Sequence, residues 1–151
     1  MAQCEIEDEI DDLDAWKKRL DLTEDEGDLA ECAKIANRIG ICYQNLKNFE
    51  QALIYHQRDA TYCAHHGDMI GRSVAYGNVG DCYLEMRNFD KAIKFYKKRL
   101  NLFSDRDNDS IGSRARIEKQ KALLGLGIAH LRKFEEISSK KDEDEDYDLI
   151  E

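Results

Sequence analysis

Apolar residues recur along this chain with the spacing of amphipathic helices. Ala36, Ile39 and Tyr43 lie on one helical face when the period is about 3.6 residues. Asp28 precedes this pattern, and Glu31 lies three residues after it, which is the spacing of a capping box at the start of a helix. The same signals predict further helix starts at Asn48, Asp68 and Asn88.

The helical pattern repeats after forty residues. When the chain is shifted by that length, residues 39–55 fall on residues 79–95, and twelve of the seventeen pairs are identical or conservative. Gly40 and Gly80 share one position inside a helix, where glycine costs roughly 1 kcal/mol relative to alanine. A cost kept at one place in two copies indicates a close approach between helices. Each copy is therefore predicted to be a helix hairpin.

The phase of the repeat divides the chain into segments. A third copy begins at Asp109, and its first helix is longer because Gly112 and Gly127 are fifteen residues apart, whereas Gly71 and Gly80 are nine apart. The predicted segments are an acidic N-terminal helix over 1–27, equivalent to the second helix of an incomplete repeat, complete repeats over 28–67 and 68–108, a partial third repeat over 109–138, and an acidic disordered tail over 139–151.

The repeated residues resemble the tetratricopeptide repeat (TPR) family. The resemblance is carried in the second copy by Tyr76, Val79, Gly80, Tyr83, Ala92 and Tyr96. The forty-residue spacing and the stretch Gly-Asp-x-x-Gly-Arg-Ser at 67–73 look more like the longer-repeat branch, which includes Pins-type scaffolds and Tonsoku-like proteins. The resemblance implies an all-α fold, a right-handed superhelical stack of antiparallel helix hairpins, or TPR-like α-solenoid.

Charge is distributed unevenly along the chain. The net charge is -9, but residues 5–14 and residues 142–151 each hold seven acidic residues and no basic one. The body between them holds 18 acidic and 23 basic residues. Acid-rich ends of this kind are typical of solvated interaction segments.

Composition excludes several classes of protein. No apolar run approaches the ~20 residues that cross a bilayer, and no apolar signal segment follows Met1. The five cysteines are odd in number and lack CxxC spacing, so a disulfide framework is not expected. We expect an intracellular protein, cytoplasmic or nuclear, with no membrane partner. The absence of proline favours helix throughout.

No residue pattern indicates catalysis. A glycine-rich phosphate loop is lacking, and the histidines have no acid or nucleophile placed by a recognisable motif. Cys63, His65 and His66 could in principle bind a metal ion, but they supply only three ligands, and histidine also suits a helix C-terminus. The aromatic residues that lie near basic ones are explained by repeat packing. We therefore expect no enzyme, no cofactor, no metal site and no direct nucleic-acid binding.

The family resemblance implies where a partner binds. Repeats of this kind bind ligands on the concave face, which the first helices line. The longer-repeat branch often has an asparagine where Asn78 stands, because one amide side chain offers a peptide both a donor and an acceptor. The positions carried over are Lys34, Asn37, Arg38, Ile41 and Asn45 in the first copy, Val74, Gly77, Asn78, Asp81 and Glu85 in the second, and Lys121, Leu124, Gly125, Ile128 and Arg132 in the third.

These observations predict a non-catalytic protein–protein interaction scaffold that binds extended peptides or a partner protein on its concave face. Arg114, Lys121 and Arg132 share one face of the third first helix, which favours acidic peptides. Two alternatives stay open. One is a self-associating structural segment, a homo-oligomer built through the wide apolar surface of residues 110–133. The other is a Tonsoku-like genome-maintenance module with a basic nuclear partner such as histone.

Overall fold

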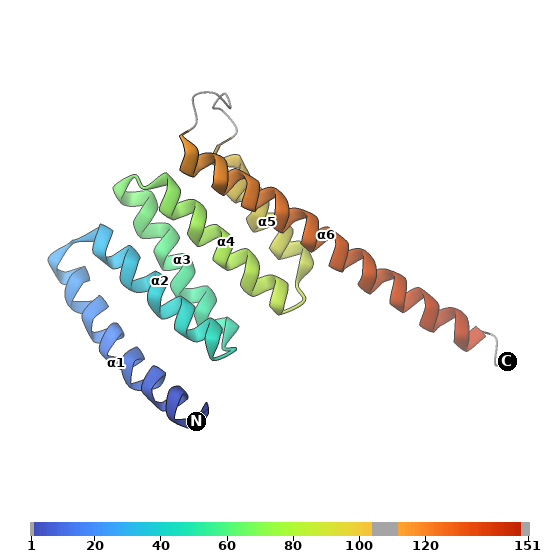
Figure 1. Ribbon diagram of the computed structural model, residues 1–151, viewed down its shortest axis with the longest axis horizontal. Coiled ribbons are helices and arrows are strands. Elements are labelled where there is room, and N and C mark those ends of the chain that lie inside the picture. Colours follow the sequence, from blue (N-terminus) through green and yellow to red (C-terminus); the bar gives the residue numbers. More distant parts are fainter. Residues whose placement is uncertain (1, 104–111, 149–151) are drawn as a thin grey trace.

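Six α-helices form the described part of the chain, which is residues 2–103 and 112–148 of a computed structural model. They are α1 (Ala2–Glu26), α2 (Leu29–Asn45), α3 (Phe49–His66), α4 (Met69–Glu85), α5 (Phe89–Asn101) and α6 (Ser113–Asp148). These residues contain no strand, and the predicted all-α solenoid is confirmed (Figure 1).

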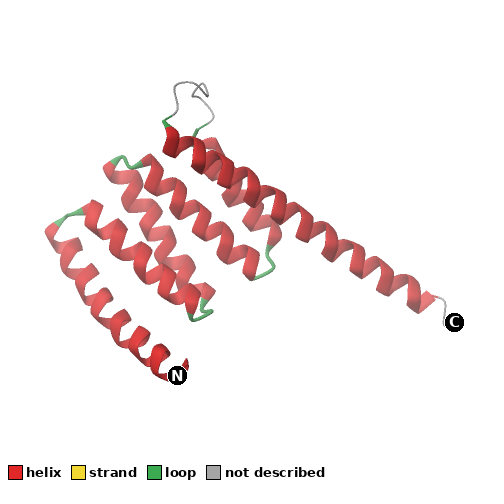
Figure 2. Cartoon of the chain, viewed as in Figure 1, coloured by secondary structure: helices red, strands yellow, loops and turns green. Residues whose placement is uncertain are grey.

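The helices stack in chain order. α2 packs against α3 and α4 packs against α5, so both predicted hairpins form, and contacts between α3 and α4 and between α5 and α6 join the units. α2, α4 and α6 lie side by side in one layer, with α3 and α5 behind it in Figure 1. Figure 2 shows the short loops that join the first five helices. The first helix of each copy therefore contributes to one common face.

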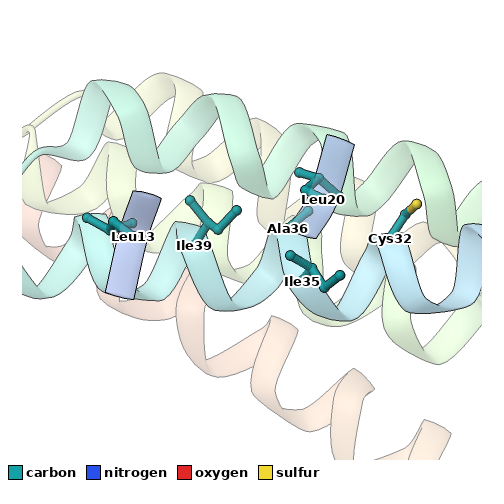
Figure 3. Packing of buried hydrophobic residues seen from close by; sticks show 6 residues of the cluster. All are labelled: Leu13, Leu20, Cys32, Ile35, Ala36 and Ile39. Carbon is teal, nitrogen blue, oxygen red and sulfur yellow. The ribbon is translucent and has the colours of Figure 1, made fainter. Parts of the chain in front are cut away.

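α1 stands where the second helix of a preceding hairpin would stand. Among the described helices it packs against α2. Trp16 is half-buried beside the cluster that joins the two helices. The cluster consists of Leu13 and Leu20 of α1 with Cys32, Ile35, Ala36 and Ile39 of α2 (Figure 3).

Polar caps begin the repeat helices, as the spacing predicted. The side chain of Asp28 accepts a hydrogen bond from the backbone N–H of Glu31 at 3.0 Å. The other caps, which bond in the same way three residues on, are Asn48, Asp68 and Asn88. Lys47 and Arg87 both have a φ of 58° in the turns inside the two hairpins. A left-handed residue at the same place in each copy shows that the two hairpins share one turn geometry.

Gly40 and Gly80 mark the closest approach inside each hairpin. A Cβ atom at Gly40 would lie 2.5 Å from the His56 ring, and one at Gly80 would lie 2.7 Å from the Tyr96 ring. The close contact predicted from the repeated glycine is confirmed. Gly127 is the corresponding residue of α6, and nothing lies within 4 Å of the Cβ position there.

α6 is longer than the predicted third copy. It runs unbroken from Ser113 to Asp148, so the prediction of a disordered tail is wrong for residues 139–148. The helix continues because neither glycine nor proline follows Gly127, and Lys140 pairs with Glu136 one turn earlier at 3.2 Å. The predicted start of the third copy at Asp109 and the last residues, 149–151, lie outside the described residues. None of the described helices has the length and apolar character that a membrane span needs.

Candidate peptide-binding groove

α2, α4 and α6 carry the residues that the sequence assigns to the concave face, here called the groove layer. Most of these side chains are exposed, so a ligand lying across the layer would meet them. The exposed members are Lys34, Arg38, Ile41, Asn45, Asp81, Glu85, Lys121, Leu124, Ile128 and Arg132, and the half-buried members are Asn37, Val74 and Asn78.

An amide pair joins α2 to α4 within the groove layer. The Asn78 Nδ2 atom donates a hydrogen bond to Asn37 Oδ1 at 3.0 Å. This contact uses one donor of Asn78 and one acceptor of Asn37. The carbonyl of Asn78 and the amino group of Asn37 are the amide atoms that a peptide backbone could engage.

The charges of the groove layer alternate from helix to helix. The cationic members are Lys34 and Arg38 on α2 and Lys121 and Arg132 on α6, and the acidic members Asp81 and Glu85 lie on α4 between them. Nearby side chains already hold some of the cations. Lys34 pairs with Glu31 at 3.3 Å, and the Arg38 guanidinium lies 4.7 Å from the centre of the Trp16 ring.

Gly77 and Gly125 do not face a ligand, which corrects the sequence assignment. Both are buried, because a side chain from α5 lies over each of them. A Cβ atom at Gly77 would lie within contact of the Arg99 guanidinium, and one at Gly125 would lie 2.7 Å from the Tyr96 ring. The family pattern placed these residues by counting along a helix, whereas the packing of α5 decides which positions remain accessible.

Tyr96 fills the space between α4 and α6 beneath the groove layer. Its ring lies against both Gly80 and Gly125, and its hydroxyl donates a hydrogen bond to Asp81 Oδ1 at 2.5 Å. Burial, together with the nearby Asp81 carboxylate, raises the pKa of the Tyr96 hydroxyl above its usual range. The Asp81 carboxylate is therefore held in place from below by a neutral donor.

A buried ion pair supports the second repeat at the next turn of α5. Arg99 hydrogen-bonds to Glu118 of α6 and to Ser73 of α4, and Arg99 and Glu118 are 7% and 6% exposed. Burial alone would raise the pKa of Glu118, but hydrogen bonds from Arg99 and Lys121 outweigh it and lower that pKa. The pair is therefore charged, and it ties the three helices together.

In the first repeat Asp59 occupies the position of Arg99, at the edge of a cavity of about 350 Å³. The carboxylate is 4% exposed and accepts a hydrogen bond from the Cys63 thiol at 3.2 Å. Burial raises the pKa of Asp59 to about 7, and burial also raises the pKa of the Cys63 thiol. Groove residues Lys34, Asn37 and Val74 line the same cavity.

Sequence reasoning did not single out Asp59 or Asp68 as candidate metal ligands. It singled out Cys63 with His65 and His66, but the structure brings Cys63 and His66 together with Asp68. The signal was present at residue 59, because Asp59 occupies the repeat position that Arg99 occupies forty residues later, with the opposite charge. Its meaning depended on its neighbours, which are Cys63 one turn later on α3 and the residues of α2 and α4 that line the same cavity.

The fold and the groove layer allow a comparison with known proteins. The family model of the tetratricopeptide repeat matches residues 31–105. Residues 31–105 are therefore similar to the tetratricopeptide repeat family. Repeats of this family mediate protein–protein interactions. No curated protein resembles the chain in sequence.

Two solved structures are similar to this fold. The first is a Signal Transduction ATPase with Numerous Domains (STAND) protein with a tetratricopeptide repeat sensor from Pyrococcus horikoshii, with a TM-score of 0.63 and 17% identity over 79% of this chain and 18% of that one. The second is BtubC from P. vanneervenii, with a TM-score of 0.57 and 16% identity over 80% of this chain and 55% of that one. The chain thus spans only part of either protein, and at this identity the likeness concerns the fold alone.

Proposed function

We propose that the groove layer of these tetratricopeptide repeats binds an extended peptide segment of a partner protein, without catalysis, inside the cell. The observation that carries the proposal is the Asn37–Asn78 amide pair, which offers a donor and an acceptor to a peptide unit. Ile41, Leu124 and Ile128 are 42%, 65% and 37% exposed on the same layer. They would give peptide side chains apolar contacts beside the amide pair.

Charge favours an acidic peptide. Cations stand on both outer helices of the layer, while Asp81 on the central helix is already engaged by Tyr96. Exposed charge pairs contribute only about 0–1 kcal/mol each, so the charge preference should be modest and should weaken with salt. Hydrogen bonds between the peptide backbone and the Asn37–Asn78 amide pair would contribute affinity that does not depend on salt concentration.

A peptide-binding measurement tests this proposal. A labelled acidic peptide with the sequence of residues 142–151 and a basic peptide of the same length are titrated with the full chain, and fluorescence anisotropy is followed at low and high salt. We expect the acidic peptide to bind more tightly at low salt. Tighter binding of the basic peptide would overturn the acidic preference, and it would favour the histone-like partner implied by the Tonsoku-like resemblance.

Matched variants localise the binding surface. Asn78→Ala should weaken both peptides, because it removes a backbone contact, while Lys121→Glu should weaken the acidic peptide alone. Lys97→Glu makes the same charge change at an exposed site on α5, outside the groove layer, and should leave both affinities unchanged. If Lys97→Glu weakens binding as much as Lys121→Glu does, the ligand is responding to net charge rather than to the groove.

A second candidate function, self-association, is favoured by the uncovered face of α6. In each hairpin a ring of the second helix covers the repeated glycine, but the Cβ position of Gly127 has no neighbour within 4 Å. Large apolar side chains surround this open position. Leu123, Leu131 and Phe134 are 52%, 57% and 68% exposed. Apolar surface of this kind on one face is typical of an interface.

A second copy of α6, packed antiparallel, is the occupant we propose for this face. The first turns of α6 carry Arg114, Arg116, Lys119 and Lys121, whereas residues 142–148 are mostly acidic. Antiparallel pairing would bring the basic start of each helix near the acidic end of its partner. Both subunits would use the same surface in such a contact, so the interface would have twofold symmetry and would close as a dimer.

Sedimentation equilibrium of the full chain tests the dimer. We expect Leu123→Glu with Phe134→Glu to shift the protein to monomer, because two charges would then lie in an apolar contact. Leu22→Glu is the control, since Leu22 is 64% exposed on α1, far from this face in the stack. A monomeric wild-type chain at micromolar concentration would rule out this candidate without affecting the groove proposal.

The branch of the family stays a prediction. The forty-residue spacing favours the longer-repeat branch of Pins-type and Tonsoku-like proteins, and the matched family and the two similar folds do not separate that branch from others. The basic-peptide arm of the binding experiment is the measurement that bears on it.

A further inference from the structure

We propose that Cys63, His66, Asp68 and Asp59 form a binding site for a divalent transition metal ion, with Zn²⁺ the best fit. One ligand atom each from Cys63, His66 and Asp68 lies within 4.8 Å of the others, and Asp59 Oδ1 lies 3.2 Å from the Cys63 sulfur. Sulfur, imidazole nitrogen and carboxylate oxygen are the ligands of zinc, and four of them match its tetrahedral preference. None of these four ligands is a groove residue, although Lys34, Asn37 and Val74 of the groove layer line the same cavity. Metal binding is measured without a peptide, so either proposal can fail without the other.

The site forms where α3 ends and α4 begins. Cys63 and His66 are three residues apart, which places them on the same side of the last turn of α3. Asp68 caps α4 through Oδ1, which accepts from the Gly71 N–H at 2.8 Å. A Cβ atom at Gly71 would lie 2.5 Å from Asp68 Oδ2 and 2.7 Å from the Cys63 sulfur. Glycine at this position is what lets the second carboxylate oxygen approach the thiol.

Only modest rearrangement is needed to close the ligands on one ion. Tetrahedral ligands that lie about 2.0–2.3 Å from zinc lie about 3.3–3.8 Å from one another. The Cys63, His66 and Asp68 atoms lie within 4.8 Å of one another and would approach by up to about 1 Å, while Asp59 lies outside that group and reaches it through the Cys63 sulfur. His66 is exposed at the end of its helix, and its side chain can turn toward the buried Cys63 and Asp59 without displacing the core.

Asp59 is the independent reason to expect a cation. The carboxylate is 4% exposed, and within residues 13–103 and 112–141, whose side chains the structure describes, it forms no ion pair with a Lys, Arg or His side chain. The equivalent position of the second repeat holds Arg99, whose charge is matched by Glu118. The first repeat therefore buries a carboxyl group without the ion-pair partner that Arg99 has in the second, close to a thiol.

Repeat packing alone does not explain the cluster. The corresponding residues one copy earlier are Thr23, Glu26 and Asp28, so the capping aspartate belongs to the repeat, whereas the thiol and the imidazole are specific to this copy. A capping role accounts for Asp68. It does not account for a cysteine and a histidine directed at the same point.

The charges around the cavity also suit a bound ion. A dipositive ion with two carboxylates and one thiolate carries a net charge of about -1. Lys34 and Arg114 line the mouth of the cavity, where they would balance that charge. Binding exchanges the thiol proton of Cys63 for the ion and releases the proton to the solvent, so it should be tighter at higher pH.

Cobalt binding tests the site directly. The full chain, treated with a chelator and then dialysed, is titrated with Co²⁺ and then with Zn²⁺. We expect one ion per chain, visible bands with the intensity of tetrahedral cobalt, and a near-ultraviolet thiolate-to-cobalt band that Zn²⁺ abolishes. Cys63→Ser should remove the thiolate band. Binding without that band, or no binding at micromolar concentration, would overturn the proposal.

A pair of matched histidine substitutions separates the loss of a metal ligand from an effect on folding. His65 and His66 are adjacent and both exposed, so neither substitution should unfold the chain. We expect His66→Ala to lower Zn²⁺ affinity by at least about 100-fold, beyond the loss seen for groups that only support a ligand, and His65→Ala to leave it unchanged. Equal effects of the two substitutions would assign the binding to adventitious surface histidines and overturn the proposal.

Discussion

The two complete hairpins, α2–α3 and α4–α5, share a backbone but differ in what they bury at equivalent positions. Each has an aspartate and an asparagine cap, a left-handed turn residue and a glycine beneath a ring. The ring is His56 in the first hairpin and Tyr96 in the second. One turn later the first hairpin buries Asp59 and the second buries Arg99.

This difference separates the residues that build the repeat from those that give each copy its chemistry. Caps, turn residues and glycines act on the backbone, so they recur. The side chain at 59 or 99 points between three helices, where either charge is costly unless a partner is supplied. The second hairpin supplies Glu118 from α6, whereas the first leaves a cavity beside Cys63.

The largest expected effect comes from removing the charge at this position in each hairpin. Arg99→Gln should lower the free energy of unfolding by about 3 kcal/mol, because Glu118 stays buried without its main partner. Asp59→Asn, measured in a chelator, should leave stability unchanged or raise it, because an unpaired buried charge is removed. Urea unfolding of both variants measures the difference. A loss of equal size in the two would mean that Asp59 has a compensating partner.

Glycine substitutions compare a glycine that a ring covers, Gly80, with one that no described side chain covers, Gly127. Gly80→Leu should lower the free energy of unfolding by about 1–3 kcal/mol, because a side chain would enter the space held by the Tyr96 ring. Gly127→Leu should not destabilise the chain, since no atom lies near its Cβ position and leucine favours helix over glycine. Thermal unfolding gives both values. If Gly80→Leu unfolds at the same temperature as the wild type, α4 and α5 can separate without loss of stability.

His56 makes the first hairpin sensitive to acid. Burial lowers the pKa of His56 to about 4, and the ring bonds to Gln44 Oε1 at 3.0 Å while its Nδ1 atom has no partner among the described residues. Between about pH 6.5 and pH 4, His56 is therefore protonated in the unfolded chain and neutral in the folded chain. This histidine should reduce stability by about 2 kcal/mol between pH 7 and pH 5.

His56→Phe isolates that contribution. The pKa of Asp59 is raised to about 7, so Asp59 favours folding as the pH falls through the same interval, by about 2 kcal/mol, and offsets the His56 contribution. The useful quantity is therefore the difference in the pH dependence of stability between the wild type and His56→Phe, from urea unfolding at several pH values. Parallel curves for the two proteins would contradict a neutral buried His56.

The caps should give the smallest effect, and an equal one in the two hairpins. Asn48→Ala and Asn88→Ala should each lower the free energy of unfolding by about 1 kcal/mol. The two losses should add in the double variant, because the sites share no partner. Thermal unfolding of the single and double variants measures this. Clearly unequal losses would show that the repeats use their caps differently.

Local features of this protein could be predicted from its residues. The caps, the helix hairpins and the contact at Gly40 and Gly80 all depend on neighbours in the sequence or on a position repeated forty residues away. The length of α6 could not, because acidic residues were taken as tail whereas pairs such as Lys140 with Glu136 extend the helix. Gly77 and Gly125 were misplaced for a related reason, since the cover over them comes from α5.

By itself the sequence determined the repeat, its period and the class of fold, because these follow from helix geometry and from the spacing of apolar residues. Only the tertiary structure decided which polar side chains meet. Asn37 reaches Asn78 from the next copy, and Arg99 reaches Glu118 of α6. These contacts join separate helices, and their distances depend on how the hairpins stack rather than on any spacing along the chain.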